Sequence, residues 1–352
     1  MTNAPRYSII VPAHNEEAVL AECHRRLKEV MDTTRERYEL IFVDDGSRDR
    51  TGEMLQDLAA LDPNVKVVSF SRNFGHQIAI SAGMDHASGD AVIVIDADLQ
   101  DPPSVILDMI AKWKEGYDVV YGRRGERQGE TAFKKATAFF FYRLLRSMTE
   151  VDIPTDVGDF RLIDRKVCDV MAGMRERNRF VRGIISWIGF RQTSVTYVRE
   201  KRFAGETKYP LSKMLRFALD AIFGFSYRPL KLASYLGLAT SLAGFAYAAY
   251  ALYLKFFTTR TVQGWTSIIA MNLVFNGIVL LILGIMGEYI GRIYDESKAR
   301  PFYVVRDKLG FRAERNDGRE QSDDGRKILR EGRRFPAMPS SPPPGEIGSP
   351  LA

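Results

Sequence analysis

Cysteine is scarce in this chain of 352 residues, where Cys23 and Cys168 are the only two. Two cysteines so far apart in sequence exclude a disulfide framework and a metal-binding Cys-x-x-Cys pair, so a reducing compartment is the simple expectation. The first residues also lack the apolar core of a signal peptide, because a short apolar run gives way at once to polar residues. We therefore expect a soluble head that stays in the cytosol.

Positive charge is only slightly in excess, with a formal net charge of +6. The surplus lies largely in residues 123–146, 175–216 and 292–308, which border the apolar part of the chain. This placement fits an anionic membrane surface or phosphate-bearing ligands better than nucleic acid, although a plain solvated face would look the same. The expected partners therefore include a membrane and exclude nucleic acid.

Short apolar runs alternate with helix-like stretches between residues 7 and 123. The predicted strands are residues 7–11, 39–44, 65–70, 91–96 and 118–122. The predicted helices are residues 16–33, 51–61, 77–87 and 103–115. Runs that are apolar nearly throughout are typical of parallel strands covered on both faces, so the predicted fold class is α/β, with a Rossmann-like, mostly parallel sheet and flanking helices. Ligand chemistry should gather at the C-terminal ends of these strands.

Two long apolar segments follow, at residues 232–254 and 266–290, and each is long enough to span a bilayer as a helix. Lys and Arg are commoner on their outer flanks than in the connector, which by the positive-inside rule places both termini in the cytoplasm. Residues 210–231 mix apolar and basic side chains at helical spacing and predict an interfacial helix, with a core-facing helix as the alternative. Glycines within the spans would let helices or neighbouring subunits approach closely.

The sharpest local signal follows the fourth predicted strand. In VIDADLQDPP, Asp96, Asp98 and Gln100 alternate along the chain and present oxygen ligands at the edge of the sheet where ligands bind. Mg²⁺ or Mn²⁺ held there would bridge the protein to a diphosphate and neutralise it as a leaving group. Asp-x-Asp alone is a weak motif, and a pair of surface acids is the plain alternative.

Polar or acidic residues also follow the first two predicted strands. Asp44 and Asp45 of FVDDGSRDRT lie in a predicted tight turn, where they would otherwise be simple turn and capping residues. Glu16 of VPAHNEE follows the first strand. Three strands that end in this way indicate a shared pocket for a nucleotide.

Residues 7–200 resemble the inverting family 2 glycosyltransferases of GT-A fold, and residues 210–308 resemble the branch of dolichyl-phosphate mannose synthases and undecaprenyl-phosphate glucosyltransferases. The resemblance rests on SIIVPAHNEE, IFVDDGSRDRT, SFSRNFGHQIAISAGMDHASGD, VIDADLQDPP, VGDFRLIDR and RFAGETKY, which occur in the family's order. It implies an enzyme that transfers a sugar, with inversion, from a nucleotide-diphospho-sugar to a polyprenyl phosphate with the aid of Mg²⁺ or Mn²⁺. UDP-glucose is the first expected donor, while GDP-mannose, UDP-N-acetylglucosamine and a modified pentose remain open, as do undecaprenyl and dolichyl phosphate as acceptors.

The resemblance also implies roles for individual residues. The donor nucleotide would meet Pro12, Glu16, Asp44, Asp45 and Asp96, and the metal would meet Asp96, Asp98 and Gln100. Arg202 and Lys208 would bind the donor pyrophosphate, Arg123 and Lys134 would bind the acceptor phosphate, and Asp98 and Asp159 would be catalytic. Because a phosphate monoester is already largely ionised at neutral pH, Asp159 would orient the acceptor rather than deprotonate it. No histidine is needed in this scheme, although His76 lies in one of the family's motifs.

For the whole chain, the resemblance and the apolar pattern together predict six parts. They are a cytosolic GT-A glycosyltransferase domain at 1–209, an interfacial amphipathic helix at 210–231, transmembrane helices at 232–254 and 266–290, a cytosolic juxtamembrane segment at 291–312 and a disordered tail at 313–352. The expected protein is a multi-pass homo-oligomer of the cytoplasmic membrane.

Three rival functions fit less well. A processive polysaccharide synthase would show a QxxRW motif and a larger membrane channel, and this sequence has neither. A sugar-nucleotide nucleotidylyltransferase would need a glycine-rich N-terminal loop, whereas VPAHNEE contains no glycine. A membrane scaffold that has lost catalysis would have no need for Asp96, Asp98 and Asp159.

Overall fold

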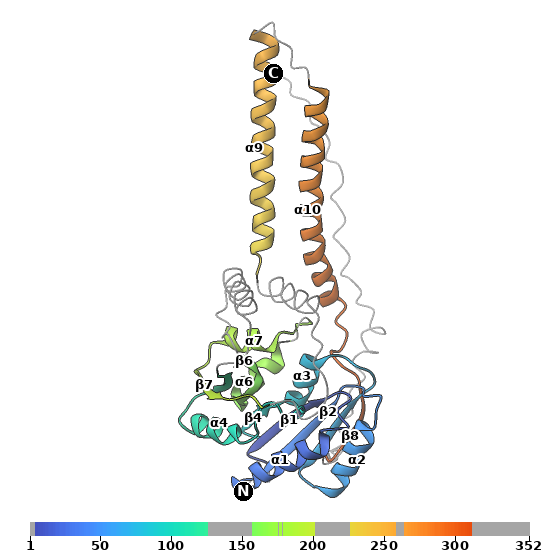
Figure 1. The fold of residues 1–352 in the computed structure, drawn as a ribbon, viewed down its shortest axis with the longest axis vertical. Helices are drawn as coiled ribbons and strands as arrows, with labels where there is room; N and C mark the ends of the chain where they lie inside the picture. The colour runs from blue at the N-terminus through green and yellow to red at the C-terminus, as the bar shows by residue number, and fades with distance from the viewer. Residues whose placement is uncertain are drawn as a thin grey trace, which may run out of the picture. The chain divides into compact units, whose positions relative to one another are not determined.

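The computed structural model describes residues 4–125, 157–200 except 175 and 178, 226–257 and 264–311. Its strands are β1 Tyr7–Ala13, β2 Tyr38–Asp44, β3 Val65–Phe70, β4 Ala91–Val94, β5 Val119–Arg124, β6 Val157–Asp164, β7 Gln192–Tyr197 and β8 Val305–Leu309. Its helices are α1 Leu20–Thr33, α2 Thr51–Leu61, α3 His76–His86, α4 Val105–Lys114, α6 Arg165–Gly173, α7 Val181–Ile188, α9 Arg228–Phe257 and α10 Trp265–Ser297. The strands form one sheet in the order β7-β5-β6-β4-β1-β2-β3-β8 (Figure 1).

The centre of the sheet is parallel. Strand β1 pairs in parallel with β2 and β4, and β2 pairs in parallel with β3. Strand β6 runs antiparallel to both of its neighbours, β4 and β5, and β8 runs antiparallel to β3. The predicted α/β class with a mostly parallel sheet is therefore confirmed, and the carboxyl ends of β1 to β4 meet at one edge.

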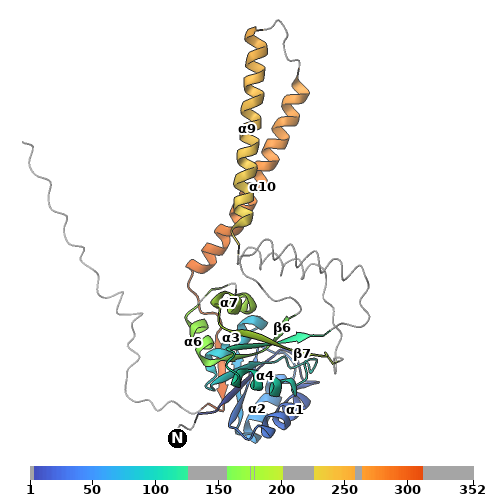
Figure 2. The same ribbon diagram turned by 90° about the vertical axis from the view of Figure 1, so that its left-hand side faces the viewer.

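Helices cover both faces of the sheet (Figure 2). Helices α1, α2 and α4 pack on the face to which Ile9 and Val11 point, and α3, α6 and α7 pack on the face to which Ile10 points. Successive side chains of a strand point to opposite faces, and all three of these residues are fully buried. This two-sided burial explains why the strand is apolar without interruption in the sequence.

The first helix begins later than predicted, at Leu20 instead of residue 16. The backbone N–H of Glu16 donates to the Thr51 hydroxyl at 2.8 Å, and that of Glu17 donates to the Asp49 carboxylate at 3.3 Å. These bonds tie the loop after β1 to the start of α2. Because the loop is held by tertiary bonds, helix propensity alone did not locate the first turn.

Helices α9 and α10 are the two long apolar helices and lie side by side (Figures 1 and 2). Their stretches Arg228–Leu254 and Ala270–Ser297 are long and apolar enough to cross a membrane. In the most apolar part of each stretch, only 6% of the α9 residues and none of the α10 residues are buried. A core helix of a soluble protein would be mostly buried, so this exposure indicates association with a membrane. Gly237 lies against Ile282 across the hairpin.

The segment at 291–312 departs from the sequence prediction. Helix α10 continues to Ser297, and residues 305–309 form β8 at the edge of the sheet. The predicted juxtamembrane segment is therefore partly a strand of the α/β domain. Residues 210–225 of the predicted interfacial helix at 210–231 lie outside the described residues. The predicted disordered tail at 313–352 lies wholly outside them.

Gly46 fixes the turn that follows β2. Its φ is +65°, in the left-handed region, and a Cβ at this position would lie 2.4 Å from the backbone carbonyl carbon of Arg72. We expect Gly46→Ala to destabilise the fold by about 1–3 kcal/mol, since neither the backbone angle nor the facing main chain accommodates a methyl group.

The matched control for this variant is Gly173→Ala, because a Cβ at Gly173 would meet nothing within 4 Å. Thermal unfolding of both full-length variants in detergent measures the difference. Equal melting temperatures for Gly46→Ala and the wild type would show that the turn tolerates a side chain.

Candidate active site

Asp96 and Asp98 lie just beyond the end of β4, which stops at Val94. The Asp98 side chain is 9% exposed and accepts a hydrogen bond from the backbone N–H of Gln100 at 3.1 Å. Between them and Gln100, Leu99 has a φ of +58°, which is uncommon for a residue with a side chain. Leu99 is buried, and backbone conformations of this kind are concentrated at functional sites.

Asp159 lies opposite Asp96 because β6 is antiparallel to β4. Val94, the last residue of β4, pairs with Arg161 of β6. Asp96 lies two residues after Val94 and Asp159 lies two residues before Arg161, so the two acids lie opposite each other. The predicted metal-binding loop and the predicted acceptor-orienting acid therefore come from segments more than 60 residues apart and meet at one end of the sheet.

Three side chains lie within 3.3 Å of the carboxylate of Asp159, and Nη2 of the buried Arg161 lies 3.9 Å from its Oδ1. Arg182 of α7 donates from Nε to Oδ1 at 2.8 Å and from Nη2 to Oδ2 at 3.2 Å. Gln77 donates from Nε2 to Oδ2 at 3.0 Å, and Nε2 of His76 lies 3.3 Å from the same oxygen. Burial by itself would raise the pKa of Asp159, but the contact with His76 and the charge of Arg182 outweigh it and hold the pKa well below its usual range. This carboxylate is therefore ionised and is a weak base.

His76, the first residue of α3, lies between two carboxylates. Its Nε2 is 3.4 Å from Oδ1 of Asp96 and 3.3 Å from Oδ2 of Asp159. Burial would lower the pKa of His76, but the contact with Asp159 and the charge of Asp96 outweigh that effect and raise it. The imidazole thus tends to carry a positive charge between the two acids.

Asp96 is the least satisfied acid of the site. Its Oδ1 is buried and has no hydrogen-bond partner among the described residues. Burial raises the pKa of Asp96 to about 6, and the nearby charges of Asp159, Asp101 and Asp98 act in the same direction, while His76 opposes them. A cation placed against this oxygen would supply the partner that no hydrogen bond provides, and it would offset the crowding of negative charge.

The described residues contain no ready-made cluster of three or more His, Cys, Asp or Glu side chains arranged to hold a metal. Mg²⁺ is usually bound through one or two carboxylates together with substrate phosphates and water, so two acids do not exclude it. Oδ1 of Asp96 makes no hydrogen bond among the described residues and lies beside the buried Asp98, which fits such a partial site.

The two acids at the end of β2, Asp44 in its last position and Asp45 just after it, have distinct surroundings. Asp44 is 1% exposed and accepts from the backbone N–H of Ser47 at 2.9 Å. The carboxylate of Asp45 accepts from the backbone N–H groups of Phe74 at 2.6 Å and Gly75 at 3.0 Å, and burial raises its pKa. Asp45 therefore anchors the loop that leads into α3. Because His76 is the first residue of that helix, Asp45 helps to position His76 in the site.

The other predicted residues divide into those that the structure describes and those that it does not. Pro12 is buried near the end of β1, Glu16 lies in the loop that follows, and Arg123 is exposed near the end of β5. Lys134, Arg202 and Lys208 lie outside the described residues.

Three residues of the site were not predicted from the sequence: His76, Gln77 and Arg182. His76 and Gln77 lie in NFGHQ, a string already used for the family resemblance, which indicated at most a loop-positioning role for His76 and none for Gln77. Arg182 gave none, because it reaches Asp159 only through the packing of α7 against the sheet.

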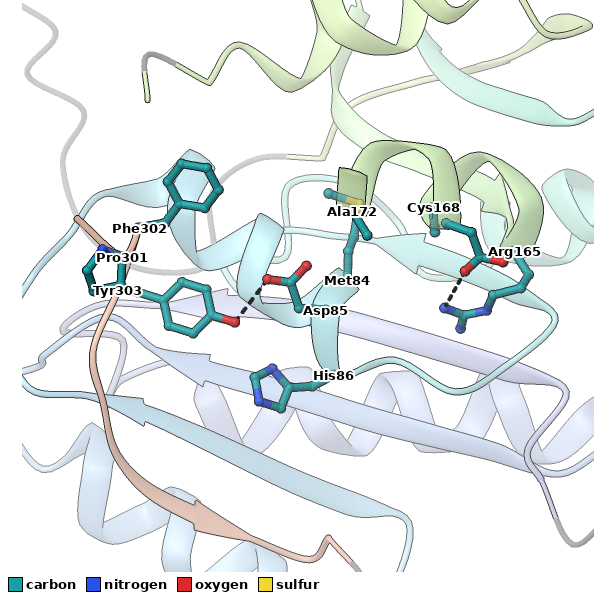
Figure 3. Close-up of a pocket in the computed structure, with 10 residues that line it drawn as sticks. Met84, Asp85, His86, Arg165, Cys168, Ala172, Pro301, Phe302 and Tyr303 are labelled. Carbon is teal, nitrogen blue, oxygen red and sulfur yellow. Dashed lines mark hydrogen bonds and ion pairs between the residues drawn. The ribbon is translucent and has the colours of Figure 1, made fainter. Parts of the chain in front are cut away.

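A separate pocket of about 550 Å³ lies where the segment after α10 meets α3 and α6 (Figure 3). In it, the hydroxyl of Tyr303 donates to the carboxylate of Asp85 at 3.0 Å, and Arg165 lies 4.0 Å from Asp169. None of the predicted site residues lines this pocket. Its paired charges indicate a structural joint, so the candidate active site remains at the strand ends.

The sequence profile of Glycosyl transferase family 2 matches residues 8–171, and that of the GtrB C-terminal hairpin matches residues 228–293. The uncharacterized glycosyltransferase YkcC of Bacillus subtilis is 61% identical over 315 residues, which cover 90% of this chain and 98% of that protein. The bactoprenol glucosyl transferase of Shigella phage SfV is 40% identical over 303 residues, 86% of this chain and 99% of that protein. A solved structure of glucosyl-3-phosphoglycerate synthase from Mycobacterium tuberculosis aligns with 62% of this chain and 76% of that chain at 19% identity, with a TM-score of 0.43, which is too distant to bear on the site.

Proposed function

This chain belongs to glycosyl transferase family 2, and from that premise we propose that it transfers a sugar from a nucleotide-diphospho-sugar to a polyprenyl phosphate with inversion. The acceptor is supported by the phage relative, whose name gives bactoprenol, and by the apolar helix pair that matches the GtrB hairpin. UDP-glucose is the proposed donor because that relative is named a glucosyl transferase. GDP-mannose, UDP-N-acetylglucosamine and a modified pentose donor are the alternatives.

The observation that carries the proposal is the meeting of Asp96, Asp98 and Asp159 at one end of the sheet. When bound, Mg²⁺ or Mn²⁺ would neutralise the departing diphosphate, with Asp96, Asp98 and Gln100 holding it. Asp159 orients the acceptor, since the low pKa of its carboxyl makes it a poor acceptor of protons. The acceptor phosphate is itself largely ionised near neutral pH and attacks the anomeric carbon without a strong base.

Charge neutralisation would come from basic side chains around this centre. The exposed Arg123, together with Lys134, is proposed to meet the acceptor phosphate, and Arg202 with Lys208 is proposed to bind the donor pyrophosphate. Two anions must approach each other for the reaction to occur, so these cations would lower the cost of bringing them together.

The hairpin would hold the enzyme on the membrane that contains its lipid acceptor. We propose that α9 and α10 both cross the bilayer and that both termini face the cytosol, because Lys and Arg flank the hairpin more than they occupy its connector. A homo-oligomer is also proposed. On α10, a Cβ at Gly277, Gly284 or Gly291 would meet nothing within 4 Å, which leaves room for a neighbouring helix.

The test is a transfer assay with purified full-length protein, Mg²⁺ or Mn²⁺, a short polyprenyl phosphate and a panel of radiolabelled nucleotide sugars. We expect label in the lipid extract with one donor, UDP-glucose first, and none after chelation of the metal. Label with another donor corrects the sugar and keeps the reaction. No transfer from any donor, together with no metal-dependent nucleotide binding, would favour a membrane scaffold.

A further inference from the structure

Strand β8 brings the segment after α10 back to the nucleotide end of the sheet. Only a short connection separates the end of α10 at Ser297 from the start of β8 at Val305. Asp44 of β2 is paired with Ser69 of β3, and Ser69 is paired with Asp307 of β8. The end of β2 and the middle of β8 therefore lie in one row across three strands.

Arg306 occupies an irregular position in this strand. Ser69 pairs with Asp307 and Phe70 pairs with Val305, so one residue of β8 at this point has no partner on β3, and that residue is Arg306. An extra residue of this kind bends a strand and re-aims a side chain, and such bulges are common next to active sites. Here the bulge coincides with the row that contains Asp44.

The side chain of Arg306 extends toward Asp44. Its Nη2 lies 3.9 Å from Oδ2 of Asp44, and its Nε lies 2.8 Å from a carboxylate oxygen of Asp307. The Arg306 side chain is 50% exposed, whereas that of Asp44 is 2% exposed. The contact with Asp44 is long, and the ion pair with Asp307 is exposed on both sides, so neither holds the guanidinium strongly and it can turn toward a ligand at little cost.

The backbone that presents Arg306 is firmly attached to the domain. The ring of Tyr303 stacks on that of Phe70 with 5.0 Å between centroids, and the backbone N–H of Ser71 donates to the carbonyl oxygen of Val304 at 3.0 Å. These contacts immediately precede the bulge. Arg306 is therefore a half-exposed, weakly paired side chain on a firmly attached piece of main chain, which suits a ligand-binding arginine.

We propose that Arg306 is a donor-binding residue that contacts the nucleoside of the nucleotide sugar beside Asp44. The inference rests on the proposed function, in which the donor nucleotide lies at the ends of β1 and β2. A guanidinium is planar, stacks on aromatic faces and donates several hydrogen bonds, so it suits a base and its ribose. Donor binding would then use a residue that follows the second apolar helix.

The experiment measures binding of UDP and GDP to the full-length protein in detergent with Mg²⁺ present, by titration calorimetry. For whichever nucleotide the wild type binds, we expect Arg306→Ala to lower the affinity by about tenfold. Arg306→Lys should lower the affinity by less, because Lys keeps the charge and loses only the planar group. In the transfer assay, the KM for the donor should rise while the KM for the lipid acceptor stays unchanged.

Lys308→Ala is the matched control, since it removes one positive charge from the same strand and no described contact joins Lys308 to Asp44. We expect wild-type binding for this variant. Equal nucleotide affinity of Arg306→Ala and the wild type would overturn the inference. An equal loss of affinity in Lys308→Ala and Arg306→Ala would also overturn it, because the effect would then come from the net charge of the strand and not from a contact of Arg306. If the wild type itself binds neither UDP nor GDP, the proposed function fails at its first step.

Should Arg306→Ala lower the melting temperature, Arg306→Met keeps the stem of the side chain and removes only the guanidinium. Weakened binding by a normally melting Arg306→Met supports the assignment. Normal binding by that variant rejects it.

Discussion

Asp98→Ala should lower sugar transfer by about a hundredfold or more, the size of effect seen when one group that stabilises charge in the transition state is removed. Asp98 is buried beside Asp96, whose Oδ1 has no hydrogen-bond partner among the described residues. Without Asp98 the diphosphate would lose one of the two carboxylates proposed to hold its cation. Initial rates with saturating Mg²⁺ and UDP-glucose measure the effect.

The control for Asp98→Ala is Asp108→Ala, which removes an exposed carboxylate of α4 and should leave the rate unchanged. Metal dependence separates the proposed role from a simple loss of folding. Wild-type protein should bind UDP more tightly with Mg²⁺ than with a chelator, and Asp98→Ala should lose that difference. Full turnover by Asp98→Ala, or turnover of the wild type in excess chelator, would remove the cation from the mechanism.

Asp159→Asn should also reduce turnover by about a hundredfold, because a reacting group displaced by about 1 Å loses that much rate. The amide keeps the shape of the side chain but loses the charge that faces Arg182 and His76. We expect kcat to fall while the affinity for UDP stays at the wild-type value, since Asp159 is proposed to act on the acceptor. Asp169→Asn, an exposed position of α6, is the control. A parallel loss of UDP affinity would place Asp159 in the donor pocket instead.

The pH profile tests the same residue in a second way. The pKa of Asp159 is held well below its usual range, so the carboxylate stays ionised from pH 5 upward and contributes no inflection there. With saturating Mg²⁺ to keep Asp96 ionised, the rate should rise through about pH 6 as the acceptor phosphate loses its second proton, and then level off. Asp159→Asn should keep this rising limb at a lower rate. Disappearance of the limb in that variant would identify Asp159 as the titrating base.

The sequence predicted β1 to β5 and missed β6, β7 and β8. The central strands were readily predicted because they are buried on both faces. Ile9, Ile10 and Val11 are all fully buried, and such residues leave an unmistakable apolar run. Strand β8 escaped prediction because its sequence VRDKL is largely charged. An edge strand pairs on one side and tolerates charge, so its pattern resembles that of a loop.

The candidate site was predicted unevenly for a similar physical reason. Asp96 and Asp98 lie two residues apart directly after an apolar strand, so local spacing was enough to propose them as candidates. Arg182 reaches Asp159 only when α7 packs on the sheet, and the bridging position of His76 exists only once β4 and β6 pair antiparallel. Contacts that depend on the tertiary arrangement leave no local pattern in the sequence.

Because β8 follows α10 in sequence and closes the sheet against β3, the apolar hairpin is an insertion within the α/β domain and not an appendage to it. A chain cut before Arg228 would leave β3 as an unprotected edge and remove the ring that covers Phe70, a combination that favours aggregation. A soluble form should therefore be sought by joining the residue before α9 to the residue after α10 with a short polar linker.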